Sequence, residues 1–146
     1  MDKLCKHSST QEENNMNLYA IHTGRILLAL YFLLPGLMKF VQWDMHVALM
    51  EKHGMVLVPI LLALAGIIQI CASVMILANR FITPAALVLA AMVVVINISL
   101  HDFWNYSGTE GAHELQNFFK NMGILGGLLL MAGFNYQKPN QTQTLL

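Results

Sequence analysis

The distribution of charged residues is the feature that most constrains this chain. Asp, Glu, Lys and Arg are absent from four stretches, residues 26–38, 53–79, 81–101 and 121–137. A helix needs roughly 20 mostly apolar residues to cross a hydrocarbon core about 30 Å thick. The middle two stretches are long enough, and apolar neighbours extend the other two. We therefore expect four membrane-spanning helices, near residues 18–40, 56–78, 82–101 and 117–135.

The composition agrees with a membrane fold. Apolar residues make up 56% of the 146 residues and charged residues only 11%, whereas a soluble domain carries about 25% charged residues. The apolar runs are continuous rather than alternating, which favours helices over the strands of a membrane barrel. The expected fold class is all-α, a polytopic membrane four-helix bundle embedded in the lipid bilayer. Eight basic and eight acidic residues cancel, so no nucleic-acid partner is expected.

The polar segments suggest how the chain is divided. We expect a polar, disordered N-terminal tail (1–16), one four-helix domain (17–136) and a polar C-terminal tail (137–146). A cleaved signal peptide is disfavoured because no small-residue cleavage site follows the first apolar stretch.

The basic residues suggest an orientation. One side of the expected bundle holds Lys3, Lys6, Arg25, Arg80 and Lys138, and the other side holds Lys39, Lys52 and Lys120. Because cytoplasmic loops carry the excess of Lys and Arg, both termini are expected in the cytoplasm. The location expected is a bacterial inner membrane.

Two polar residues are expected inside the membrane on the terminal side. At 1.5 Å per residue, Arg25 and Gln69 reach about the same depth and are expected to form an intramembrane polar pair. Pro35 removes a backbone donor within the first helix and is expected to kink it.

A second group of polar residues is expected at the opposite end of the bundle. Depth counting brings to one level a set of candidate ligand-binding residues, namely Lys39, Asn97, His101, Asp102, Trp104 and Asn121. His101 is the candidate proton relay, because histidine titrates near neutral pH. Each residue also has a structural interpretation, as an interface anchor, an aromatic belt residue or a helix cap. The functional hypothesis therefore depends on their convergence.

Other kinds of site find little support. The four histidines on that side lack the spacing of a zinc motif, so no metal site is expected. Cys5 and Cys71 are far apart, which excludes C-x-x-C dithiol chemistry. No nucleotide-binding or acyl-transfer motif occurs.

Several segments together resemble the DoxX family of small four-helix membrane proteins. They are GRILLALYF at 24–32, GLMKF at 36–40, HDFW at 101–104, NFFKN at 117–121 and GGLLL at 126–130. The resemblance covers roughly residues 18–134. The family usually has a glutamate in the second helix where this chain has Gln69, so a proton site at that position is in doubt.

The resemblance implies a function in membrane redox chemistry. Some family members are similar to the membrane subunit of thiosulfate:quinone oxidoreductases. This chain is therefore expected to be an accessory or quinone-interacting subunit that receives electrons from a soluble or membrane partner and is not catalytic alone. The alternatives are a small-solute or lipid transport protein and a structural assembly factor. A homo-oligomer is left open.

Overall fold

The computed structural model describes the backbone of residues 2–137 and the side chains of residues 16–135. The helices, in chain order, are α1 (Asp2–Val41), α2 (Trp43–Lys52), α3 (Val58–Leu77), α4 (Ile82–Leu100), the short 3-10 helix η1 (Phe103–Asn105) and α5 (Gly108–Gln137). Over residues 2–137 there is no strand, and the all-α fold class is confirmed.

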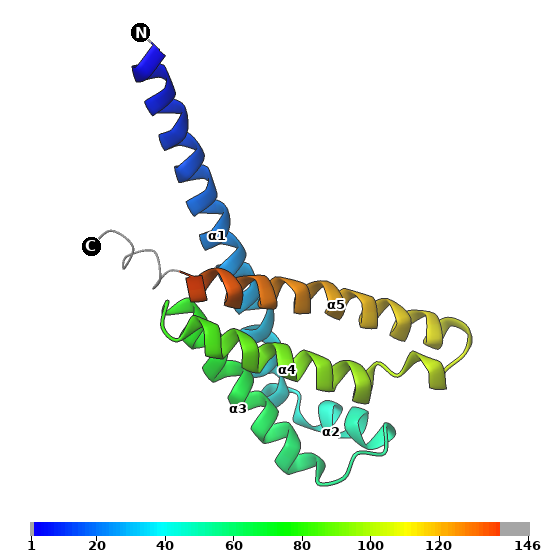
Figure 1. Ribbon diagram of the computed structural model, residues 1–146. Coiled ribbons are helices and arrows are strands. Elements are labelled where there is room, and N and C mark those ends of the chain that lie inside the picture. The colour runs from blue at the N-terminus through cyan, green and yellow to red at the C-terminus, as the bar shows by residue number, and fades with distance from the viewer. Residues whose placement is uncertain (1, 138–146) are drawn as a thin grey trace.

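The helices form two pairs. Helix α1 packs mainly on α3, α4 packs mainly on α5, and the contact between α3 and α4 joins the pairs (Figure 1). The α3–α4 connection is a tight turn, and we call this end of the bundle the turn end. At the opposite end, which we call the polar end, α4 passes through η1 into α5 and the C-terminus of α2 lies close by.

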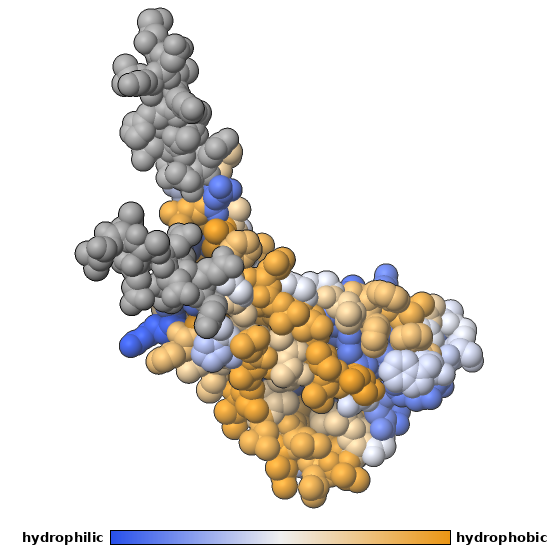
Figure 2. All heavy atoms as spheres, viewed as in Figure 1, coloured by the Kyte–Doolittle hydropathy of each residue, from blue (hydrophilic) through white to orange (hydrophobic). Residues whose placement is uncertain are grey.

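Small residues make up about half of the bundle core, and many of the large apolar residues lie on its outside. The main core contains six alanines among its eleven buried residues, Ala29, Ala72, Ala85, Ala86, Ala90 and Ala132. Leucine, isoleucine, valine and phenylalanine side chains cover the exposed faces, which appear as the orange surface in Figure 2. Helices that associate in lipid pack through small residues, because the lipid tails already solvate the large ones.

The number of membrane spans differs from the prediction. Within the described part of the chain, three segments are long and apolar enough to cross a membrane, Met16–Val41, Val58–Leu77 and Ile82–Asn105. Helix α5 is longer than each of these segments, but it starts at Gly108 and its first turns are polar. The described part has five α-helices, so the predicted count of four helices is not confirmed.

The polar segments are also more helical than expected. The segment between residues 41 and 55 contains α2, and the backbone of α1 continues to Asp2 through the segment expected to be a disordered tail. Helix propagation explains this extension, because each added residue gains one backbone hydrogen bond once a helix exists. The C-terminal tail after Gln137 lies outside the described residues. Helix α1 is continuous through Pro35.

Two glycines set the contact between α1 and α3. A Cβ atom at Gly36 would lie 3.0 Å from Cγ1 of Ile70, and one at Gly66 would lie 2.5 Å from the Phe40 ring. A side chain at either position would therefore have to displace its neighbour, Ile70 or the Phe40 ring. This close approach brings the C-terminal end of α1 against the middle of α3.

Candidate functional site

The close contact of α1 and α3 moves Lys39 away from the expected site. Its Nζ donates a hydrogen bond to Oε1 of Gln69 over 2.8 Å, and Gln69 is buried midway along α3. Lys39 is thus bound to α3 and does not line the pocket that contains His101, so its role in ligand binding stays a prediction. Counting residues along each helix gives no information about the contact between α1 and α3, and this contact sets their relative position.

In the described part of the chain, the hydrogen bonds of Arg25 and Gln69 go to other residues than each other. Arg25 Nη1 donates instead to the Oδ1 of Asn79, in the turn that follows α3. The Gln69 side chain accepts its hydrogen bond from Lys39, and the backbone carbonyl of Gln69 accepts one from Ser73 Oγ over 2.7 Å. The two residues thus belong to different contacts, one at the turn end and one in the middle of the bundle.

An open pocket of about 450 Å³ lies near the polar end. Its lining comes from α1, α5 and the residue that follows α4, and consists of Tyr31, His101, Asn117, Lys120, Asn121 and Ile124. This volume falls within the range of about 300–1,000 Å³ that is usual for small-molecule sites. His101 and Asn121 were expected in the site, whereas Tyr31, Asn117 and Lys120 were not among the predicted ligand-binding residues.

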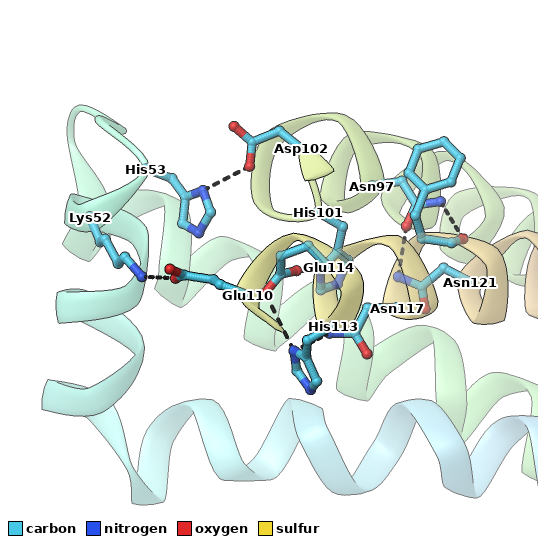
Figure 3. A network of polar contacts seen from close by, with 11 residues as sticks. Lys52, His53, Asn97, His101, Asp102, Glu110, His113, Glu114, Asn117 and Asn121 are labelled. Atoms are coloured by element: carbon cyan, nitrogen blue, oxygen red, sulfur yellow. Dashed lines mark hydrogen bonds and ion pairs between the residues drawn. The ribbon is translucent and has the colours of Figure 1, made fainter. Parts of the chain in front are cut away.

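His101 is held by a carboxylate. Its Nδ1 lies 2.7 Å from Oε2 of Glu114, and the other carboxylate oxygen lies 3.6 Å from Nδ1 of His113 (Figure 3). Burial raises the pKa of Glu114. The charge of His101 and the hydrogen bonds from His101, His113 and Asn117 lower it by more than burial raises it, so the pKa lies below its usual value. Glu114 is therefore an ionised hydrogen-bond acceptor at neutral pH.

Asn97 and Asn121 form a second chain of hydrogen bonds. Asn97 is buried and donates through Nδ2 to the backbone carbonyl of Phe118 over 3.1 Å. Its Oδ1 accepts a hydrogen bond from Nδ2 of Asn121 over 2.8 Å. Asn97 is thus satisfied behind the pocket, and Asn121 is the member of the pair that lines it.

Asp102 takes part in a different contact. Its Oδ1 lies 3.2 Å from Nδ1 of His53, without the geometry of a hydrogen bond, and its Oδ2 accepts a hydrogen bond from Asn105 over 2.6 Å. The His53 side chain is only 4% exposed. A neighbouring ion pair joins Lys52 to Glu110 at the surface. These contacts attach the C-terminus of α2 to the polar end, outside the pocket.

Trp104 is part of an aromatic cluster. Its ring contacts Phe103 and Phe118 edge to face, with centroids 5.2 and 6.4 Å away, and 55% of the residue remains exposed. Trp104 is not among the residues that line the pocket. This arrangement fits the aromatic belt that was the structural interpretation of this residue.

The acidic partner of His101 was missed because residues 102–116 lie between the expected spans 82–101 and 117–135 and were not assigned to a helix. Within α5, Glu110, Glu114, Asn117 and Asn121 recur at intervals of three or four residues, which places them on one helical face. That spacing was the available signal. Among the residues searched, no group of three or more His, Cys, Asp or Glu side chains has the arrangement of a metal site.

The comparisons with known proteins identify the family. The profile of the DoxX family matches residues 20–102, and the chain therefore belongs to the DoxX family, a family of membrane proteins. The match includes Tyr31 and His101 and ends before the pocket residues of α5. The chain is also similar to inner membrane protein YphA of Escherichia coli (strain K12), at 26% identity over 109 residues, which cover 75% of this chain and 78% of the relative. No solved structure matches the chain significantly.

Proposed function

We propose that this protein is an accessory subunit of a membrane redox system and that its pocket binds the head group of a quinone. The observation that carries the proposal is the lining of the pocket, which combines a cation, two amides, a carboxylate-bound histidine and apolar walls. Lys120 and Asn117 can donate hydrogen bonds to the oxygens of such a ring, and Tyr31 and Ile124 supply apolar surface.

The ligand is expected to come from the bilayer, and the electrons are expected to come from a partner. It adjoins the apolar half of α5, so a lipid-soluble molecule can enter it from the bilayer. The described residues contain no metal cluster and offer the single free thiol of Cys71. Electrons are therefore expected from a redox group on a partner subunit, while His101 exchanges protons with the ligand.

The membrane location is part of the same proposal. The relative YphA is named an inner membrane protein, and we extend that location to this chain with both termini in the cytoplasm. Arg25 and Arg80 at the turn end support this orientation through the positive-inside rule. A reporter that fluoresces only in the cytoplasm, fused after Leu146, should be fluorescent, and a dark fusion of normal abundance would reverse the orientation.

The test is the identity of the molecule that accompanies the protein. The protein is extracted with its surrounding lipid by a styrene–maleic acid copolymer, and the organic extract is analysed by mass spectrometry. We expect enrichment of quinone over the membrane average, and loss of this enrichment in Lys120→Ala and His101→Ala. Lys52→Ala is the matched control, since Lys52 lies at the polar end but outside the pocket.

The alternatives predict different outcomes of the same measurement. Equal quinone content in Lys120→Ala and in the Lys52→Ala control would exclude this pocket as the quinone site. Enrichment of a phospholipid or a solute instead of quinone would favour transport or lipid handling. A pocket without any enriched molecule would favour the assembly factor.

A further inference from the structure

Two hydrogen-bond chains end at the pocket, and each starts from a group that can only accept. One starts at the carboxylate of Glu114 and reaches His101, and the other starts at the backbone carbonyl of Phe118 and reaches Asn121 through Asn97 (Figure 3). Because the first group of each chain has no proton to donate, it fixes the direction of every hydrogen bond that follows.

In the first chain, the carboxylate fixes the tautomer of His101. Nδ1 must carry a proton in order to donate to Oε2 of Glu114 over 2.7 Å. In a neutral imidazole the other nitrogen then has a free lone pair. Since His101 lines the pocket, Nε2 is the nitrogen left to accept a hydrogen bond from a ligand.

In the second chain, the backbone carbonyl fixes two amides. Asn97 must present Nδ2 to the carbonyl of Phe118, which turns its Oδ1 toward Asn121. Asn121 must then present its own Nδ2 to Asn97. Asn121 is then left with its Oδ1, which is a second acceptor for the pocket, and with the other hydrogen of Nδ2 as a donor.

The remaining polar groups of the pocket do not oppose this pattern. Lys120 Nζ and Asn117 Nδ2 can donate to the oxygen of a hydroxyl as well as to that of a carbonyl, and the Tyr31 hydroxyl can donate or accept. The other titratable groups around His101 and Glu114 lie on α5, α2 and the α4–α5 connection, and are His113, Glu110, Lys52, His53, Asp102 and Tyr106.

We propose that the pocket selects the reduced, hydroxyl-bearing form of its ligand, with Nε2 of His101 and Oδ1 of Asn121 accepting hydrogen bonds from that ligand. This inference rests on the proposed function for the class of ligand, and it adds the redox form that is bound. Glu114 is the positioning residue, since it acts through His101. A quinone carbonyl facing either acceptor would leave two lone pairs opposed, whereas a quinol hydroxyl satisfies the acceptor.

The test compares two probes that differ only in redox form, decylubiquinol and decylubiquinone. Their binding is measured on the full chain in lipid nanodiscs, under argon, at pH 8, where a histidine ring is ordinarily neutral. We expect the quinol to bind about tenfold more tightly, which corresponds to about 1.4 kcal/mol. In Glu114→Leu, His101 is free to carry its proton on Nε2, and the preference should fall severalfold. Glu110→Gln is the matched control, one turn earlier on α5, and should keep the preference.

The tautomer of His101 can also be measured in the wild-type protein without ligand, and this test does not need the Glu114→Leu variant to fold. Nitrogen NMR of labelled histidine distinguishes the two neutral tautomers, and His101 should carry its proton on Nδ1. A proton on Nε2 of His101 would overturn the inference. Equal affinity for both probes would overturn it and leave quinone binding intact, whereas failure of both probes to bind would overturn the proposed function as well.

Discussion

The two helix pairs of this bundle are held together in different ways. The α1–α3 pair meets through Gly36 and Gly66, with the hydrogen bond of Lys39 to Gln69 enclosed at the point of contact. The α4–α5 pair meets in the alanine-rich core that it shares with α1 and α3, and its polar contacts gather near its two ends. The first pair therefore meets at two glycines, where an added side chain would press on Ile70 or on the Phe40 ring. The second leaves polar groups at its border, where a ligand can reach them.

The largest effect is expected from adding bulk to the α1–α3 junction. Gly36→Leu places a side chain where Ile70 is already 3.0 Å from the Cβ position. Such overpacking should lower the free energy of unfolding by about 3 kcal/mol, measured by SDS titration in mixed micelles. Gly24→Leu on the same helix is the control, because no atom lies within 4 Å of its Cβ position. Equal losses in both variants would mean that α1 and α3 do not approach as closely as described.

The next effect concerns the enclosed hydrogen bond of the same junction. Gln69→Leu leaves the Lys39 ammonium without its acceptor and should cost about 2 kcal/mol, since bonds to charged groups are the stronger ones. Lys39→Met in the Gln69→Leu background should recover part of this loss, because the unpaired charge is removed. Additive losses in the double variant would contradict a direct contact between the two side chains.

A smaller effect is expected in the α4–α5 pair. Asn97→Leu removes both hydrogen bonds of Asn97, and interhelical hydrogen bonds in membranes contribute about 0.6 kcal/mol each. The stability should therefore fall by about 1 kcal/mol, while the preference for the reduced probe should weaken because Asn121 is free to rotate. A loss as large as that of Gly36→Leu would remove the contrast between the two pairs.

The smallest effect is the pH dependence of the polar end. The pKa of Glu114 is lower in the folded protein than its ordinary value, so the unfolded chain binds more protons in the acidic range. The stabilisation is complete above the ordinary range of a glutamate and is lost as the pH falls through the lowered value. The Tm should drop by a few degrees more in the wild type than in Glu114→Gln between neutral and acidic pH, and Glu51→Gln should behave as the wild type.

The sequence was sufficient to predict the elements that depend only on neighbouring residues along the chain. The absence of charge over residues 53–79 and 81–101 predicted two of the three candidate spans within a few residues, and the third follows from residues 26–38 with their apolar neighbours. His101 and Asn121 were placed in the same neighbourhood by counting helical rise from the helix ends, and the structure does bring them to one pocket.

What could not be predicted depends on contacts between helices. The depth of Lys39 follows from the approach of α1 to α3 at Gly36 and Gly66, which no count along a single helix contains. The role of Glu114 depended on where α5 begins. Because α5 already starts at Gly108, Glu114 lies on a helical face beside His101 rather than in a loop.

The tight connections before α3 and α4 carry a further consequence. Leu57 and Phe81 precede these helices with φ values of 56° and 53°, a left-handed conformation that costs a residue with a side chain about 1–2 kcal/mol. Both side chains are mostly exposed, so side-chain packing within the protein offsets little of this cost, and we expect their immersion in lipid to offset more of it. The bilayer thus acts as a folding partner for these two turns. A detergent that covers them poorly would loosen the entry to both central helices before it disturbs their cores.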